Sequence, residues 1–209
     1  MRNNSTILHR LQLWYSDQPD AAAQFYKDAE QKWKPIKVRA YWLQVVRIAL
    51  YLERKKKQDS SSRVAIFAAN SPEWIHWELG TWLAGMTSVG IHPNTLKADF
   101  QKMVAIAKPI LIVSDHLHHA NLVESEVEVL PFSAASKVLM EAVPEDERAL
   151  ASAGNALLEK LSTNQICTSI FTSGTTGTPK GVLLGLKQLT FVADTLSRGE
   201  QKLVVAALK

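Results

Sequence analysis

The chain has 209 residues, 46% of them hydrophobic, and is long enough to bury a sizeable core in one large domain or in part of one. Its net charge of +4 is small and spread along the chain, which argues against a nucleic-acid-binding protein. The single cysteine excludes an intrachain disulfide, and no apolar run approaches the ~20 residues that span a bilayer. We therefore expect a soluble, cytoplasmic protein that is at most peripheral to a membrane.

The first 62 residues are expected to form an N-terminal segment of two helices with a hairpin between them. Apolar side chains recur every three or four positions in both predicted helices, and Ser5 or Thr6 precedes the first as an N-cap. A polar linker, residues 57–62, closes the segment. The expected elements are a helix over 6–15, strands over 21–26 and 33–36, and a helix over 38–53.

Residues 63–209 are expected to form an α/β subdomain. Short continuous apolar runs predict strands that are buried on both faces, and capped amphipathic segments between them predict helices. Pro72 follows a cap at Asn70-Ser71, and Thr95 is expected to cap the second helix. This order indicates a parallel-sheet βαβαβ core with right-handed crossovers and flanking helices. The expected strands cover 64–68, 88–91, 110–113 and 127–130, the helices 72–86 and 95–107, and shorter helices lie within 121–165.

A glycine-rich loop over residues 172–181 follows an apolar segment and precedes another, so it is predicted to connect two buried strands. Gly174 and Gly177 allow consecutive backbone N–H groups to turn toward one point, and such a nest attracts an anion. Lys180 adds a positive charge. Further donors come from the hydroxyl groups of Thr172, Ser173, Thr175, Thr176 and Thr178. A polyphosphate suits this chemistry best.

Two alternatives to this interpretation are weaker. The P-loop of NTPases requires G-x-x-x-x-G-K-[ST], but here Thr178 and Pro179 separate Gly177 from Lys180. Gly181 also stands where a P-loop has its magnesium-binding hydroxyl. A hairpin loop without any ligand is the other alternative, and the number of specified positions argues against it.

Three other features have ordinary structural explanations. The basic run Arg54–Lys57 ends a predicted helix, where positive charge is favoured, although contact with a membrane surface or an anionic substrate stays open. Cys167 lies in an apolar strand and is expected to be a small core residue rather than a nucleophile. A group of three histidines could suggest a metal site, but no cysteine or clustered carboxylate accompanies it at metal-ligand spacing. We therefore expect these histidines to begin a solvated helix. The histidines are His116, His118 and His119.

Residues 172–181 resemble the phosphate-binding signature of the AMP-forming, adenylate-making enzymes, which include acyl- and aryl-CoA synthetases. Residues 63–67 and 70–74 look like the strand and helix start found early in acyl-CoA synthetases. Trp-Lys-Pro-Ile at 33–36 is similar to the long-chain fatty acyl members in particular. The resemblance implies the N-terminal part of the AMP-binding domain of a long-chain fatty acyl-CoA synthetase.

That resemblance also implies a reaction and its site. A carboxylate, expected to be a fatty acid, would attack Mg·ATP to give an acyl-adenylate, and coenzyme A would then displace AMP. Thr172 is expected near Mg²⁺, and Lys180 is expected to act catalytically by offsetting charge on the departing pyrophosphate. The implied ATP-binding residues are Thr172, Ser173, Gly174, Thr175, Thr176, Gly177, Thr178 and Lys180.

The sequence departs from the family pattern in two places. Leu186 stands where many members have a histidine near the acyl pocket, and the chain ends at Lys209 before the magnesium-binding glutamate, the ribose-binding aspartate and the C-terminal catalytic lysine. We therefore expect an N-terminal portion that is inactive alone and tends to self-associate. An adenylating enzyme with another acid or thiol acceptor, and a non-catalytic or split phosphate-binding protein, stay open as alternatives.

Overall fold

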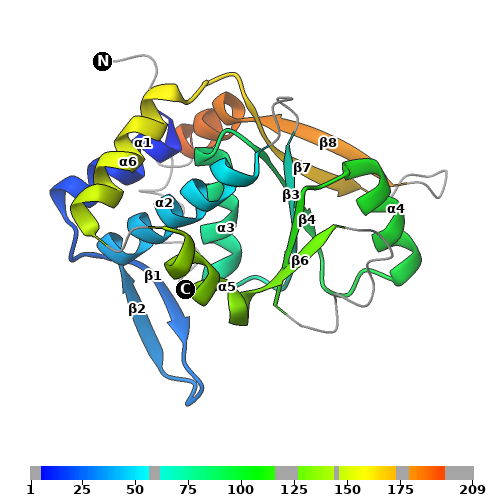
Figure 1. The fold of residues 1–209 in the computed structure, drawn as a ribbon, viewed down its shortest axis with the longest axis horizontal. Helices are drawn as coiled ribbons and strands as arrows, with labels where there is room; N and C mark the ends of the chain where they lie inside the picture. The colour runs from blue at the N-terminus through cyan, green and yellow to red at the C-terminus, as the bar shows by residue number, and fades with distance from the viewer. Residues whose placement is uncertain (1–5, 57–61, 116–126, 144–145, 173–178, 196–209) are drawn as a thin grey trace.

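The computed structural model describes residues 6–56, 62–115, 127–143, 146–172 and 179–195. A six-stranded sheet lies between helices on its two faces, and a separate two-stranded hairpin projects from the body (Figure 1). The strands are β1 Ala22–Lys27, β2 Trp33–Lys37, β3 Arg63–Phe67, β4 Thr87–Ile91, β5 Leu111–Ser114, β6 Glu128–Pro131, β7 Ile166–Thr172 and β8 Lys180–Gly185. The helices are α1 Ile7–Asp17, α2 Val38–Lys55, α3 Pro72–Leu83, α4 Lys97–Ala107, α5 Phe132–Ala142 and α6 Glu147–Lys160, and 186–195 is also helical.

The large sheet has the order β6-β5-β3-β4-β7-β8. Its first five strands run parallel, whereas β8 pairs antiparallel with β7 at one edge. Successive β3 residues point to opposite faces: Val64 and Ile66 join the core under α2 and α3, and Ala65 and Phe67 join the smaller core under α4. The predicted α/β class, with its parallel core and flanking helices, is confirmed.

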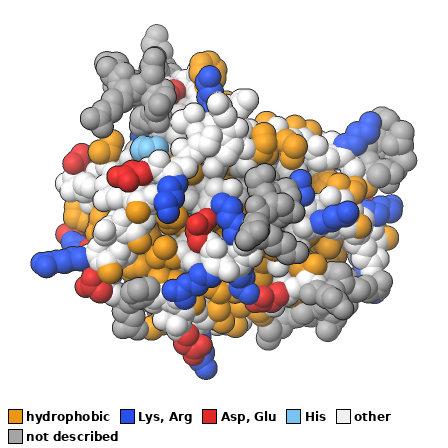
Figure 2. All heavy atoms as spheres, turned by 45° about the horizontal axis from the view of Figure 1, so that its top comes forward, with side chains coloured by type: hydrophobic (Ala, Val, Ile, Leu, Met, Phe, Trp, Pro, Cys, Tyr) orange, Lys and Arg blue, Asp and Glu red, His pale blue; other side chains and the backbone are white. Residues whose placement is uncertain are grey.

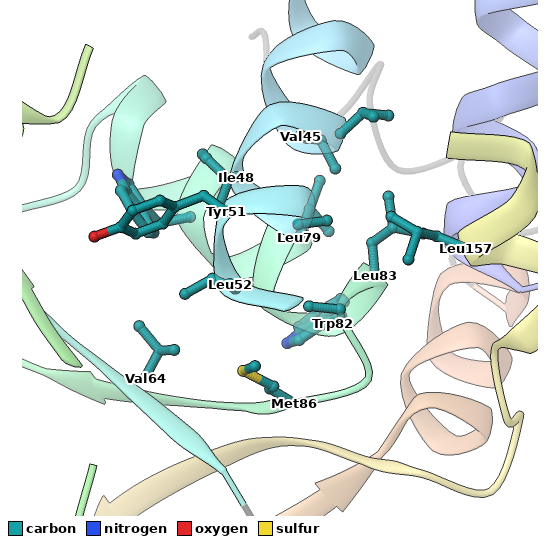
Figure 3. Packing of buried hydrophobic residues seen from close by; sticks show 14 of the residues in the cluster. Val45, Ile48, Tyr51, Leu52, Val64, Leu79, Trp82, Leu83, Met86 and Leu157 are labelled. Atoms are coloured by element: carbon teal, nitrogen blue, oxygen red, sulfur yellow. The ribbon is translucent and has the colours of Figure 1, made fainter. Parts of the chain in front are cut away.

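Helix α3 is packed between α2 and the sheet (Figure 3), as its apolar residues on nearly every side predicted. Trp77 and Trp82 are only 2% and 6% exposed. The two helices approach closely at Gly80, where an added Cβ would lie 2.5 Å from Cγ2 of Ile48. A larger residue at position 80 would therefore push α2 away from α3.

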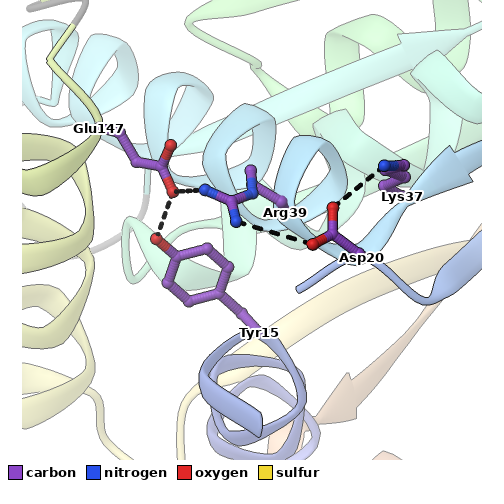
Figure 4. Close-up of polar contacts among 5 residues, drawn as sticks. All are labelled: Tyr15, Asp20, Lys37, Arg39 and Glu147. Atoms are coloured by element: carbon purple, nitrogen blue, oxygen red, sulfur yellow. Dashed lines mark hydrogen bonds and ion pairs between the residues drawn. The ribbon is translucent and has the colours of Figure 1, made fainter. Parts of the chain in front are cut away.

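The N-terminal helices are also joined to α6 by a polar cluster (Figure 4). The Tyr15 hydroxyl and the Arg39 guanidinium both donate to Oε1 of Glu147, at 3.0 and 2.8 Å. Arg39 also lies 4.0 Å from Asp20, which pairs with Lys37 at 3.0 Å. Residues 1–62 thus share contacts with later elements, and the division at residue 62 stays a prediction.

Two predicted helix boundaries were wrong. Helix α3 ends at Leu83 rather than Met86, because Gly85 adopts a positive φ of 70° and turns the chain toward β4. Helix α4 begins at Lys97 with Leu96 as its N-cap and without a side-chain cap. Thr95 instead donates its backbone N–H to the His92 carbonyl in the preceding turn. The other two predicted caps are confirmed: of Ser5 and Thr6 it is Thr6, and of Asn70 and Ser71 it is Ser71, whose side chain accepts a bond from a backbone N–H of the helix.

The prediction of two buried strands around the glycine-rich loop holds for only part of β7. Cys167, Thr168 and Ser169 are buried, but most of β8 is exposed. Val182 and Leu183, for example, are 46% and 54% exposed. The reason is topological: β8 lies at the edge of the sheet, where the described elements leave much of its surface uncovered.

Acidic, basic and hydrophobic side chains are interspersed on the face drawn in Figure 2. Within the described part of the chain, no helix combines the length and the apolar character that crossing a membrane requires.

Candidate functional site

The stems of the glycine-rich loop are β7 and β8. Their antiparallel ladder closes with Thr172 opposite Lys180, and the Thr172 hydroxyl donates to the Lys180 carbonyl oxygen at 3.4 Å. Both residues are exposed. The ladder therefore brings together a threonine and a lysine that are eight positions apart in sequence. The other candidate site residues fall outside the described ranges: Ser173, Gly174, Thr175, Thr176, Gly177 and Thr178.

A cavity of about 460 Å³ lies beside the same strand. Ile170, two residues before Thr172, is part of its wall, so β7 connects the cavity to the loop. Most of the lining is apolar and comes from α3, β4, β7, β8 and the helical residues after β8. Trp74, Trp82, Ile91, Ile170, Leu184 and Leu189 supply much of it.

Glu78 is the acidic residue of this cavity. Its Oε1 lies 3.3 Å from the hydroxyl of Ser88 and 3.5 Å from that of Thr168. Ser88 in turn accepts a bond from Nε1 of Trp82 at 3.1 Å. Burial raises the pKa of Glu78 to about 7, although both hydroxyl contacts oppose the shift. Near neutral pH this carboxyl therefore exists in both protonation states.

Sequence reasoning did not single out Glu78. The local signal was an acid in the run Trp-Ile-His-Trp-Glu-Leu, where the neighbours at both sides are apolar. Carboxylates are rarely buried without a partner, so an acid within an all-round apolar helix is a candidate for a perturbed group. Its partners Ser88 and Thr168 lie 10 and 90 positions away and carried no such signal.

The basic run has internal partners. Arg54 donates to the carbonyl of Ala142, Lys55 pairs with Glu128, and Lys56 donates to the carbonyl of Ala84 at 2.9 Å. Two of these contacts satisfy backbone carbonyl groups and the third is an ion pair, and together they tie the end of α2 to the body. The described portion of the run is therefore structural rather than a free anion-binding patch.

Cys167 and the histidines have different outcomes. Cys167 is buried, and burial raises the pKa of its thiol to about 12, which confirms a core residue and leaves little thiolate. The segment with His116, His118 and His119 is not among the described residues. Across the residues that the structure does describe, no group of three or more His, Cys, Asp or Glu side chains is placed to hold a metal.

The family model for AMP-binding enzymes matches residues 11–207. Long-chain-fatty-acid–CoA ligase ACSBG1 from Homo sapiens is 32% identical over 186 residues, covering 78% of this chain and 24% of the relative. The related ligase ACSBG2 from Gallus gallus is 31% identical, with 69% and 22% covered. The chain thus spans about a quarter of the length of these curated relatives.

Solved structures show the same fold at lower identity. VinN superposes with a TM-score of 0.76 at 18% identity, over 95% of this chain and 48% of VinN. A fatty acyl-adenylate ligase from L. pneumophila, solved with acyl adenylate and pyrophosphate, gives 0.67 at 19% identity, over 92% and 32%. At these identities the likeness shows that this chain shares its fold with part of each structure.

Proposed function

Because this chain belongs to the AMP-binding enzyme family, we propose that it is the phosphate-binding portion of an AMP-forming acid–thiol ligase. The proposed reaction activates a long-chain fatty acid to an acyl-adenylate and then to acyl-CoA. The observation that carries the proposal is the β7–β8 ladder, which holds Thr172 and Lys180 together at the two ends of a glycine-rich loop. The long-chain substrate is proposed from the curated relatives, which are named as long-chain-fatty-acid–CoA ligases.

The chemistry requires an anion to react at a polyanion. The fatty carboxylate attacks the α-phosphate of ATP and pyrophosphate leaves; the thiol of coenzyme A then attacks the acyl carbonyl and AMP leaves. A carboxylate is already nucleophilic, so the first step needs no general base. It needs charge neutralisation, which Lys180 and the donors of the loop would provide at the departing pyrophosphate. Each hydrogen bond to a charged oxygen contributes about 1.5–3 kcal/mol.

Magnesium fits this site only together with the nucleotide. Thr172 is exposed at the loop stem, where its hydroxyl would be an oxygen ligand, and the described residues add no cluster of carboxylates around it. Mg²⁺ commonly binds through few protein oxygens and several phosphate and water oxygens, so Thr172 would hold one position while the triphosphate supplies others. When bound, the metal would neutralise charge on the phosphates.

Two alternatives lead to different experiments. A different acid or a different thiol acceptor would leave the loop chemistry unchanged, whereas a short or split protein would bind phosphate without turnover. The reading frame that contains these codons distinguishes a short or split protein from a ligase. A ligase requires downstream residues for adenine, ribose and the thiol step, so its reading frame must encode them.

The substrate is tested with the protein encoded by that complete reading frame. We would measure ATP–pyrophosphate exchange and thioester formation with palmitate, benzoate and aspartate as competing acids. Exchange and coenzyme A thioester that both depend on palmitate support the proposal. Exchange with benzoate or aspartate alone would favour another acid, and exchange without thioester would favour another acceptor.

Peripheral membrane contact is a further part of the proposal, and the β1–β2 hairpin suits it better than the basic run does. Phe25 and Trp33 on the projecting hairpin are 58% and 66% exposed, and Lys27 lies 5.4 Å from the Trp33 ring. Aromatic rings beside lysines are favoured at the membrane–water interface. Replacing both aromatic residues by serine should abolish co-sedimentation with phosphatidylserine-containing vesicles; unchanged co-sedimentation would exclude the hairpin.

A further inference from the structure

We propose that the cavity between α3 and the sheet is a small-molecule site for an apolar amine, with Glu78 as the acceptor of its ammonium group. The site is distinct from the phosphate loop, and the proposal does not depend on the ligase reaction. Its evidence is the position of the cavity in the sheet, the chemistry of its walls and the placement of the Glu78 carboxyl.

The cavity lies at a position where α/β folds bind ligands. Ala68 and Asn70 follow the carboxyl end of β3, Ile91 and His92 mark the carboxyl end of β4, and all four line the cavity. The chain leaves β3 for α3, which packs on the larger core, and leaves β4 for α4, which packs on the smaller core of the opposite face. Adjacent parallel strands whose helices go to opposite faces create a crevice at their carboxyl ends.

The walls favour an apolar ligand with one polar group. The volume of about 460 Å³ is within the range of small-molecule pockets, which are mainly apolar with a few polar groups that fix orientation. Trp74 and Trp82 contribute aromatic surface, and Glu78 is the charged acceptor among them. Among the described residues that line the cavity there is neither lysine nor arginine.

The placement of Glu78 selects the sign of the ligand's charge. Its Oε1 is held by the hydroxyls of Ser88 and Thr168, so the carboxyl is fixed in position and half-buried beside the cavity. An ammonium group would pair with the carboxylate and could also lie against a tryptophan face. A ligand carboxylate would add a second negative charge in a poorly solvated place and is disfavoured. An alcohol carries no charge, so it can form a hydrogen bond with the Glu78 carboxyl but no ion pair.

Affinity for the amine should rise with pH because Glu78 must be ionised. Burial holds its pKa at about 7, so ionisation is incomplete at pH 6 and nearly complete at pH 8. Tyr41 and Cys167 also interact with Glu78, but burial raises the pKa of each to about 12 and both stay neutral in this range. Among the described residues that line the cavity, His92 is the other one with an ionisable side chain.

The experiment compares three probes with the same chain and different head groups: octylamine, octanol and octanoate. Calorimetric titration of the 209-residue protein at pH 6 and pH 8 should give the tightest binding for octylamine, with at least threefold higher affinity at pH 8. Octanoate should bind at least tenfold more weakly than octylamine. Equal affinity for octanoate and octylamine, or no binding of octylamine, would overturn the proposal.

Variants locate the binding in this cavity. Glu78→Gln should lower octylamine affinity at least tenfold at pH 8 and change octanol affinity less than twofold. Glu73→Gln is the matched control, because Glu73 lies on the same helix but does not line this cavity. Gly90→Ala should weaken both octylamine and octanol, since an added Cβ would lie 3.3 Å from Cζ2 of Trp74 and narrow the space. Octylamine binding that is unchanged in Glu78→Gln would place the amine elsewhere.

Discussion

Thr172 and Lys180 form the last pair of the β7–β8 ladder, and the Thr172 hydroxyl donates to the carbonyl of Lys180 rather than to its side chain. The backbone of Lys180 is therefore fixed by the sheet, while the residue remains exposed. Such an arrangement separates structural and chemical roles: the main chain closes the ladder, and the ammonium group stays available to an anion at the loop.

Replacement of Lys180 by alanine should therefore impair chemistry more than folding. In the complete enzyme, Lys180→Ala should slow adenylate formation at least tenfold, which corresponds to about 1.4 kcal/mol. The melting temperature should change little because the backbone pairing is kept. Pyrophosphate exchange and thermal unfolding measure the two effects, and exchange at the wild-type rate would contradict a role in pyrophosphate departure.

The glycines of the loop should be needed for anion binding. Gly174→Val and Gly177→Val each add a branched side chain where we expect the backbone to turn its N–H groups inward. In the complete enzyme both variants should lose ATP protection of the loop against proteolysis, while their circular dichroism stays that of the wild type. If both bind ATP normally, the loop is not a nest of backbone donors.

Glu78 and His76 should give opposing pH dependences of stability. Burial raises the pKa of Glu78 from 4.5 to about 7, so the folded chain binds more protons between these values and stability falls as pH rises through them. Burial lowers the pKa of His76 from 6.5 to about 4, so the folded chain binds fewer protons there and stability rises with pH. Each shift corresponds to about 3 kcal/mol.

The two contributions can be separated by neutral replacements. Relative to wild type, Glu78→Gln should be more stable by about 1 kcal/mol at pH 5 and by about 3 kcal/mol at pH 8. His76→Gln should instead be more stable than the wild type at pH 5. At that pH the unfolded chain protonates His76, whereas burial in the folded chain opposes its protonation, so the histidine disfavours folding. Urea unfolding at the two pH values measures both; a pH-independent difference for Glu78→Gln would mean that its carboxyl is not desolvated in solution.

Local patterns were sufficient for most elements of this fold. The apolar run Val64–Ala68 predicted β3, and Ser71-Pro72 predicted the start of α3, because both signals lie within a few residues. The exposure of β8 was missed because it depends on strand order rather than on its own apolar residues. The environment of Glu78 was missed for the same reason, since β4 and β7 supply the neighbouring hydroxyls.

The isolated 209-residue chain should not form acyl-CoA from palmitate, ATP, Mg²⁺ and coenzyme A. The sequence contains the glycine-rich loop, but the family's residues for adenine, ribose and the thiol step cannot be matched to it. Mass spectrometry of a reaction with purified chain should therefore detect no palmitoyl-CoA. A chain that turns over palmitate would show that these 209 residues suffice.

The same chain should self-associate through β8. Helix α3 packs against α2, and most of its apolar side chains join the larger core. The strand β8 exposes Val182 and Leu183, and no described strand pairs with its outer edge, which favours pairing with another copy. Val182→Thr combined with Leu183→Glu should shift the mass measured by light scattering toward the monomer. Leu96→Glu, at an exposed apolar residue before α4, is the control and should leave the mass unchanged. A wild-type chain that is monomeric at the same concentration would contradict self-association through this edge.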